Sequence, residues 1–530
     1  MTTLSQSGAR HDADVRRGAR HRANLGGVAR GGMLGLVGAG VSAGSGVLIV
    51  FILARALPAA DAGTFFVVTS VFLLSQAVAK LGTTTSLVYF ISRFRSLGVP
   101  ERIAGCLRTA FGPVLGLSLL IAVAMYTAAP WLTETLLGGP SEQAQTALRV
   151  LAVLVPVAAV ADAAVSATRG FDTMRPTVAL DGVGRSALQV FAVVLAVLLG
   201  WQAVGILAAA WALPYLLPAV LGSRDLARRV RVAAGDRRVG TQAFSAGEFW
   251  RFTGPRALAS VAQIALQRLD IVLVAALLGP VSAAIYTAAT RVLIVGQLSN
   301  QAISSAVQPR LGELLAREDI AATNAAYRAA TAWLVLLNWP LYLLFALFAP
   351  TLLSVFGPAY SAGQSVVVIL CAVMLLASAC GMVNLVLIMT GRTTWNLVNA
   401  LLALGVNVAV DLLLIPRMGI TGAAVGWAAA IAVSNLVALA QIYTSKGLHP
   451  FGAGTLFAMA LSLACFGGIP GAAVLAFGGG VTTLVLSALA GTAAYGLGCY
   501  RLRQPLAMDV FHTRAELPPR QSQGCHRVPP

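Results

Sequence analysis

The chain has 530 residues, of which 58% are hydrophobic and only 11% are charged. Soluble domains carry roughly 25% charged residues, and so few charges could not cover the apolar surface of a soluble protein of this length. The formal charge of +18 is typical of nucleic-acid-binding proteins, but here the arginines fall in short gaps between apolar segments, as in the loops of membrane proteins. We therefore predict an all-α membrane protein that binds the lipid bilayer and no nucleic acid.

Apolar segments follow one another along almost the whole chain. About thirty polar, Arg-rich residues come first, and the apolar run after them is too long for a cleaved signal peptide. A membrane-spanning helix needs about 20 mostly apolar residues. On that criterion we predict fourteen transmembrane helices, at residues 33–54, 62–90, 109–129, 148–168, 177–199, 203–222, 253–278, 282–308, 330–349, 363–389, 395–415, 421–443, 453–474 and 479–499.

The basic residues predict how these helices are oriented. With the N-terminus inside, 29 basic residues fall in the inner loops and tails, whereas only Arg55, Arg149 and Arg417 fall outside. Cytoplasmic loops carry an excess of Lys and Arg. We therefore predict a multi-pass protein of the plasma membrane, with an even number of helices and both termini in the cytoplasm.

Weak internal similarity divides the chain into two halves. Ala54-Arg55-Ala56-Leu57 lies 221 positions before Ala275-Ala276-Leu277-Leu278, and the same offset joins Gly170 to Gly391. Halves of six helices enter from the same side, so a pseudo-two-fold axis along the membrane normal relates them, with a binding site between them. We predict a basic cytoplasmic tail, a six-helix bundle, a cytoplasmic linker, a second six-helix bundle, two additional helices and a disordered cytoplasmic tail, at 1–31, 32–222, 223–252, 253–445, 446–500 and 501–530.

The sequence offers no pattern typical of a catalytic or metal site. The six cysteines have neither the spacing of metal ligands nor that of a disulfide framework. There is no P-loop and no nucleophile elbow. We therefore expect no metal, no cofactor and no enzymatic activity.

Several short stretches are similar to one transporter superfamily. The first helix pair contains Leu53-Ala54-Arg55-Ala56-Leu57-Pro58 and Ala62-Gly63-Thr64-Phe65, and the seventh and eighth helices contain Gly279-Pro280 and Ala284-Ile285-Tyr286. The most specific stretch is Leu414-Ile415-Pro416-Arg417-Met418-Gly419-Ile420-Thr421-Gly422-Ala423-Ala424. Over about residues 30–445 the chain resembles the MOP superfamily (multidrug, oligosaccharidyl-lipid and polysaccharide exporters), specifically its oligosaccharide flippases. One departure is Ala284, where the family commonly has Gly.

This resemblance implies a function as well as a fold. It implies two six-helix bundles around a V-shaped cavity that works by alternating access. The implied substrate is an oligosaccharide linked to undecaprenyl diphosphate, flipped from the cytoplasmic to the outer face of a bacterial cell membrane. The product would serve the synthesis of a cell-surface lipopolysaccharide or exopolysaccharide, with polysaccharide polymerase and glycosyltransferases as partner enzymes.

Other functions remain open at this point. A peptidoglycan lipid-precursor flippase and a cation-coupled multidrug exporter would have the same fold. A multidrug exporter needs an acidic cavity for cationic drugs, whereas the charges within the predicted helices are five basic and four acidic. A membrane glycosyltransferase or polymerase fits less well, because the predicted outer loops are short and their only acids are Asp61, Glu134 and Glu142.

Four basic residues within the predicted helices are candidates for substrate binding. An ionisable group at a helix centre costs at least ~2.5–3.5 kcal/mol in a bilayer, so it is a functional candidate by default. Cations in a water-filled cleft could replace part of the hydration of a diphosphate. The candidates are Lys80, Arg256, Arg268 and Arg291. Lys80 and Arg268 lie deepest and have no obvious partner in their own helix, whereas Arg256 could instead reach the membrane surface.

Three carboxylates are candidates for ion coupling or for structural ion pairs: Asp162, Asp270 and Asp411. Asp270 and Arg291 lie about ten residues on either side of the turn after Leu278, so a hairpin would bring them to one depth as an ion pair. Asp162 and Asp411 could also hydrogen-bond between helices.

Other polar residues in the helices have simpler expected roles. Asp181 and Arg185 are four residues apart on one helix, a spacing at which opposite charges neutralise each other. Gln263, Gln267, Gln297, Asn300 and Gln301 either join helices or line an aqueous path. From the sequence we predict that Lys80→Ala or Arg268→Ala abolishes translocation without lowering the amount of folded protein.

Overall fold

The computed structural model describes residues 33–234 and 244–501. Within those residues every regular element is a helix. The predicted tail at 1–31 and almost all of the tail at 501–530 lie outside them.

The first half of the molecule starts with a helix at Met33–Ala56. Eleven further helical elements follow before the gap after residue 234: α2 (Ala59–Ala79), α3 (Thr83–Ser96), α4 (Glu101–Thr127), α5 (Ala129–Leu137), α6 (Glu142–Arg169), η1 (Thr177–Arg185), α7 (Ser186–Leu198), α8 (Val204–Ala212), the short η2 and η3 (Leu213–Tyr215, Pro218–Gly222) and α9 (Ser223–Ala234).

The second half starts with the longest helix in the described residues, α10 (Ala246–Leu278). It continues through α11 (Pro280–Ala289), η4 (Thr290–Val292), α12 (Leu293–Ala316), α13 (Ile320–Leu347), α14 (Ala349–Ser354), η5 (Pro358–Gly363), α15 (Gln364–Cys380), α16 (Val383–Met389), α17 (Thr393–Met418) and α18 (Ile420–Lys446). The last elements are α19 (Ala453–Ser462), η6 (Leu463–Gly468), α20 (Ile469–Phe477) and α21 (Val481–Arg501).

The predicted membrane spans agree with these helices. Thirteen helical runs among the described residues are long and apolar enough to cross a membrane, and they coincide with thirteen of the fourteen predicted spans. The other predicted span, at 282–308, lies in α11, η4 and α12, which form a helical run with a 3-10 turn in its middle. The prediction of an all-α membrane protein with about fourteen spanning helices is confirmed.

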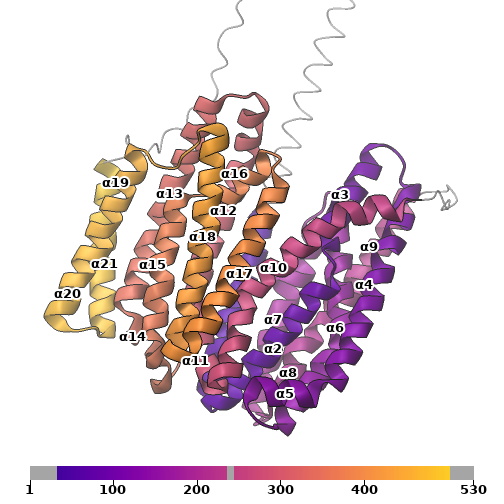
Figure 1. Ribbon diagram of the computed structural model, residues 1–530, viewed down its shortest axis with the longest axis horizontal. Coiled ribbons are helices and arrows are strands. Elements are labelled where there is room, and N and C mark those ends of the chain that lie inside the picture. The colour runs from indigo at the N-terminus through magenta and orange to yellow at the C-terminus, as the bar shows by residue number, and fades with distance from the viewer. Residues whose placement is uncertain (1–32, 235–243, 502–530) are drawn as a thin grey trace, which may run out of the picture.

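The two six-helix bundles share an apolar core at one end only. Phe65 of α2 and Ile285 of α11 belong to a single buried cluster that draws on both bundles. At the opposite end the clusters are separate, one around Phe90, which only the start of α10 joins from the second half, and the other around Tyr327. Figure 1 shows the bundles converging near α5 and α11 and diverging towards α3 and α16. The molecule is therefore V-shaped, with a closed end and an open end.

Backbone contact between the bundles is direct at the closed end. A Cβ atom on Gly63 of α2 would lie 1.8 Å from the carbonyl oxygen of Pro280, so only glycine permits this approach of α2 to α11. The Nε atom of Arg55 donates a hydrogen bond of 2.8 Å to the carbonyl oxygen of Val355 in the other bundle. Beside it, the rings of Phe51 and Phe356 pack edge to face, 6.1 Å apart.

Helix α10 lies along the boundary between the bundles (Figure 1). Its first turns pack on the first bundle, where Phe249 is buried in the cluster around Phe90. Further along, its backbone at Ala257 meets Gly82, which has a φ of +66° and joins α2 to α3.

Both ends of the predicted linker at 223–252 are helical, as α9 and as the start of α10.

The last two spanning helices pack on the outside of the second bundle. Ala458 of α19 joins a buried cluster with Val335 and Trp339 of α13. The side chains of Leu475, Phe477 and Leu489 are 90%, 83% and 63% exposed, as expected for a surface that faces lipid. These helices take no part in the boundary between the bundles.

Candidate functional site

Two adjoining chambers lie between the bundles. The first, which we call the entrance chamber, has a volume of about 410 Å³ and lies between the first helix, α10 and α12. The second, which we call the deep chamber, has a volume of about 240 Å³ and lies between the first helix, α2, α7, α8 and α10. Both are lined by Ser42, Gly46, Arg268, Ile271 and Arg291.

The order of the chambers along the cavity follows from the first helix. This helix runs from the open end to the closed end. The entrance chamber touches it at residues 39–46, and the deep chamber touches it at residues 42–50. The deep chamber is therefore the one nearer the closed end, and Arg268 and Arg291 lie where the two chambers meet.

Arg268 and Arg291 come from different local structures. Arg268 lies in the last third of α10, whereas Arg291 lies in η4, the 3-10 turn between α11 and α12. That turn holds the Arg291 side chain in place: Nε donates to the carbonyl oxygen of Thr287 at 3.1 Å, and Nη2 donates to the hydroxyl of Thr290 at 3.3 Å. Within the described part of the chain, neither guanidinium forms an ion pair. The sequence-based candidates Arg268 and Arg291 thus lie together on one cavity wall.

Uncharged polar side chains surround this pair in the entrance chamber. Gln267, Gln297 and Gln301 line it and are exposed to it. The sequence suggested two roles for these glutamines, helix joining or an aqueous path, and their exposure in the cavity agrees with the second. Asp270 is the only acidic residue among the lining residues.

Asp270 is buried and bonds to Tyr286 rather than to Arg291. The Tyr286 hydroxyl donates to Oδ2 of Asp270 at 2.8 Å. The ion pair with Arg291 that we expected from the hairpin does not form among the described residues, so this expectation is wrong. The two residues do reach the same depth, since both line the entrance chamber.

A second buried carboxyl faces Asp270 from α17. The carboxyls of Asp411 and Asp270 lie close enough to influence each other electrostatically, and Nδ2 of Asn407 donates to Oδ2 of Asp411 at 3.2 Å. All three side chains are at most 3% exposed. Their Oδ1 atoms have no hydrogen-bond partner within the described structure. Buried oxygens of this kind ordinarily have partners, which makes this group a candidate for holding a proton or a cation.

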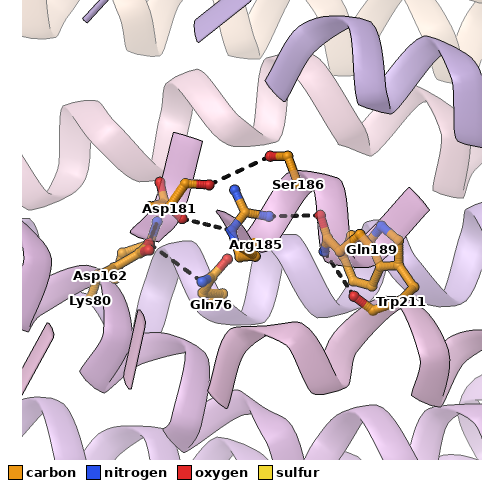
Figure 2. A network of polar contacts seen from close by, with 8 residues as sticks. All are labelled: Gln76, Lys80, Asp162, Asp181, Arg185, Ser186, Gln189 and Trp211. Carbon is orange, nitrogen blue, oxygen red and sulfur yellow. Dashed lines mark hydrogen bonds and ion pairs between the residues drawn. The ribbon is translucent and has the colours of Figure 1, made fainter. Parts of the chain in front are cut away.

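Lys80 lies elsewhere, in a polar network inside the first bundle (Figure 2). Its Nζ atom forms an ion pair of 2.6 Å with Oδ2 of Asp162 on α6. Gln76 donates to the same carboxylate at 3.4 Å. Lys80 lines neither chamber, so the structure separates it from Arg268, with which the sequence had grouped it. Asp162 likewise has a structural partner.

The network continues to the wall of the deep chamber. Arg185 donates to Asp181 at 2.6 Å, which confirms the neutralising pair predicted from the spacing, and to Oε1 of Gln189 at 3.0 Å. Gln189 in turn donates to the carbonyl oxygen of Trp211 at 2.8 Å. Figure 2 shows this chain of contacts from Asp181 to Trp211. Arg185, Gln189 and Trp211 all line the deep chamber.

Arg256 lies outside both chambers. Its guanidinium stacks over the ring of Phe252, 3.7 Å from the centroid, and donates to the carbonyl oxygen of the same residue at 2.8 Å. Phe252 provides both contacts and lies in the same helix as Arg256, near the open end.

Sequence reasoning missed several residues of the site. Ser42, Gln189, Trp211 and Tyr215 all line the cavity, yet we had assigned none of them to it. Gln189 did carry a signal, because it is the only amide in the predicted helix at 177–199 and lies four residues after Arg185. Trp211 and Tyr215 carried none, since an aromatic residue in an apolar helix is ordinarily a packing residue.

Comparison with known proteins places the chain in a family. A family model with the description "Polysaccharide biosynthesis protein" matches residues 28–315, which is more than half of the chain. None of the curated proteins matches the chain.

Solved transporter structures share the fold. The lipid II flippase MurJ, in an inward closed conformation, has a TM-score of 0.70 and 12% identity over 88% of this chain and 98% of that one. An inward-facing multidrug resistance MATE family transporter of the MOP superfamily has a TM-score of 0.61 and 17% identity over 78% and 94%. A MOP superfamily transporter from Pyrococcus furiosus Vc1, described as having a binding pocket of reverse polarity, has a TM-score of 0.55 and 18% identity over 79% and 95%. The chain therefore belongs to the polysaccharide biosynthesis protein family and has the membrane fold of the MOP superfamily.

Proposed function

We propose that this protein flips oligosaccharides linked to undecaprenyl diphosphate from the cytoplasmic to the outer face of a bacterial cell membrane, for cell-surface polysaccharide synthesis. The observation that carries the proposal is the pair Arg268 and Arg291, two cations that have no ion-pair partner among the described residues and that line a polar cavity between two bundles. A diphosphate loses water on entering the membrane interior, and guanidinium groups replace that hydration with charge-assisted hydrogen bonds.

The open end is the cytoplasmic end in this proposal. Basic residues gather at the open ends of the helices, among them Arg95, Arg317, Arg392 and Lys446, and cytoplasmic loops are the ones enriched in Lys and Arg. The structure then corresponds to an inward-open state, able to take its substrate from the cytoplasmic leaflet. Glycosyltransferases would act before this step, and a polysaccharide polymerase would act after it.

The charge of the cavity favours an anionic substrate over a cationic drug. The two chambers together are lined by three arginines and one aspartate, and Arg185 among them is neutralised by Asp181. A multidrug exporter for cations would need the opposite balance. For the P. furiosus transporter, reverse polarity of the pocket was taken to suggest a different function, so pocket charge is informative within this fold. A peptidoglycan precursor is also an anionic lipid, and flipping assays with both lipids decide between them.

We also propose that Asp270, Asp411 and Asn407 couple transport to a cation or proton. Two carboxylates that share one buried site cannot both remain charged without a proton or a cation between them. Their partnerless oxygens are ligands of the type that hard cations prefer. Because α10 carries both Asp270 and Arg268, occupancy of this site could alter the position of a substrate-binding residue.

A reconstituted flipping assay tests the substrate site. Arg268→Gln and Arg291→Gln should each slow the flipping of a lipid-diphosphate oligosaccharide roughly 10- to 100-fold, because each removes a charge-assisted contact of about 1.5–3 kcal/mol. The matched control is Arg256→Gln, which changes an arginine of the same helix outside the cavity and should leave the rate close to that of the unaltered protein. Unaltered rates for both cavity variants would contradict the proposal.

The coupling proposal needs a different measurement. Asp411→Asn should remove the response of the flipping rate to an imposed sodium or proton gradient, while the protein still binds its lipid substrate. A response of normal size in this variant, to whichever ion drives the unaltered protein, would show that Asp411 has a purely structural role.

A further inference from the structure

The deep chamber has the chemistry of a sugar site. Aromatic rings form part of its wall, from Trp211, Tyr215, Phe65 and Phe66, and the rings of Phe65 and Trp211 pack edge to face. Hydroxyl groups and one amide, that of Gln189, also line the chamber, and no carboxylate is among its lining residues. Pockets that bind small molecules typically combine aromatic surface with a few fixed polar groups in this way.

One hydroxyl in this chamber lacks a partner. Thr287 lies on α11, lines the deep chamber and is only 2% exposed. Its Oγ1 atom has no hydrogen-bond partner within the described structure. A buried hydroxyl without a partner is uncommon in native proteins and requires an explanation. A ligand hydroxyl in the chamber would provide one.

Trp211 is held in a fixed orientation beside that space. Its indole packs edge to face against Phe72 and Tyr215, with ring centroids 5.7 Å and 6.0 Å away. The carbonyl oxygen of Trp211 accepts the hydrogen bond from Gln189, which Arg185 holds in turn (Figure 2). The ion-pair network of the first bundle thus fixes one wall of the deep chamber before any ligand enters.

The position of the chamber indicates which part of a substrate it holds. Arg268 and Arg291 separate the two chambers, and the deep chamber lies on the side of the closed end. If the diphosphate binds these arginines, its two substituents must leave in different directions. The lipid chain has to return to the membrane, so the group that enters the deep chamber is the sugar.

We propose that the deep chamber binds the sugar residue attached directly to the diphosphate, with a face of the sugar ring on Trp211 and a sugar hydroxyl on Thr287. Sugar C–H groups carry a slight positive charge and pack well on the negative face of an aromatic ring. The volume of about 240 Å³ is below the roughly 300–1,000 Å³ of pockets for drug-sized ligands, so one sugar unit enters and the rest of the glycan stays outside. This inference rests on the proposed function.

The test measures the binding of two probes to the full-length protein in nanodiscs. One probe is a polyprenyl diphosphate that carries a single sugar, and the other is the same polyprenyl diphosphate without it. Trp211→Leu and Thr287→Val should each weaken binding of the sugar-bearing probe roughly three- to tenfold, as expected for the loss of one good contact, and should change binding of the sugar-free probe far less. Trp211→Phe, which retains an aromatic face, should recover part of the loss.

Stability measurements separate binding from folding. Thr287→Val removes a hydroxyl that has no partner, so the melting temperature of this variant should not fall. If both Trp211→Leu and Thr287→Val fold and change the two affinities equally, or not at all, the sugar site is disproved. Arg268→Gln should weaken the binding of both probes by the same factor. If it leaves both affinities unchanged, the proposed function fails instead, whatever the Trp211 variants show.

Discussion

Pairing divides the cations buried in this protein into two groups. Lys80 and Arg185 each contact a carboxylate at 2.6 Å inside the first bundle. Arg268 and Arg291 have no carboxylate partner within the described residues and face a cavity instead. A paired cation contributes to stability, whereas an unpaired cation beside a cavity retains its charge for a ligand. The position of a charge within the membrane is therefore less informative about function than its partner.

This distinction changes what we expect from Lys80. Removing one member of a buried pair leaves the other charge uncompensated, which costs about 3–5 kcal/mol in full burial. Lys80 and Asp162 are 22% and 21% exposed, so we expect a smaller loss from Lys80→Met, about 1–3 kcal/mol. The variant should melt at a lower temperature and be recovered in smaller amounts, and the protein that remains folded should flip its substrate.

The pair Arg93 and Glu248 provides the control. It has an N–O distance of 3.0 Å, but its side chains are 45% and 47% exposed, and exposed pairs contribute about 0–1 kcal/mol. Arg93→Met should therefore leave the melting temperature nearly unchanged. A folded Lys80→Met protein of normal stability that cannot flip its substrate would restore the binding role predicted from the sequence.

Local spacing predicted only some of the contacts at this scale. Asp181 and Arg185 are four residues apart on one helix, and their ion pair could be predicted from that spacing alone. The contact between Lys80 and Asp162 joins two helices, and it depends on how each helix is rotated about its axis. The expected pair of Asp270 and Arg291 failed for a related reason: η4 changes the helical phase just before Arg291, while Tyr286 reaches Asp270 from the preceding turn.

At the scale of elements, the closed end depends on one close approach between helices. Gly63→Ala would put a Cβ atom 1.8 Å from the carbonyl oxygen of Pro280. Such overpacking typically costs about 1–3 kcal/mol, and here the cost falls on the state in which α2 and α11 touch. We expect Gly63→Ala to shift the population towards conformations that are open at this end, measured as longer distances between spin labels at positions 131 and 355.

A matched control for this variant exists in α4 of the same bundle. A Cβ atom on Gly116 would meet no other atom within 4 Å. Gly116→Ala should therefore leave the distance distribution unchanged. If Gly63→Ala gives the same distribution as Gly116→Ala, the contact at Pro280 does not determine the closed state.

The number and order of the elements could be predicted well, but their interruptions could not. Apolar length alone placed all the spans, because the bilayer demands about 20 apolar residues for each helix. The break after Lys80 depends on Leu81 and Gly82, with φ values of +50° and +66°, and a helical hydropathy pattern gives no sign of it. The 3-10 turn at Thr290–Val292 is equally hidden, although it positions Arg291 in the cavity.

At the scale of the whole molecule, we propose that two bundles with separate cores at one end and a shared core at the other alternate between two arrangements. The shared cluster closes one end, while separate clusters keep each bundle intact at the other. Rocking one bundle against the other would exchange a limited set of contacts, including those of Arg55 and Phe51. The halves and their order could be predicted from internal similarity, whereas which end is closed could not.

A cross-link across the closed end should stop this motion. In a variant without the native cysteines, Arg55→Cys and Val355→Cys place thiols at positions that are hydrogen-bonded across the bundles. A short thiol cross-linker should abolish flipping in the double variant. Each single variant, treated with the same reagent as a control, should remain active because it has no second thiol to cross-link. Flipping at the normal rate by fully cross-linked protein would show that the closed end does not open during transport.

The location of the bound diphosphate is the most direct test of the central claim, that an unpaired arginine pair between two bundles receives an anionic lipid. The measurement is an experimental structure of the protein in nanodiscs with a lipid-diphosphate oligosaccharide bound. We predict both phosphates within hydrogen-bond distance of Arg268 and Arg291, at the junction of the two chambers. Density for the diphosphate elsewhere, with these two guanidinium groups contacting only protein or water, would contradict it.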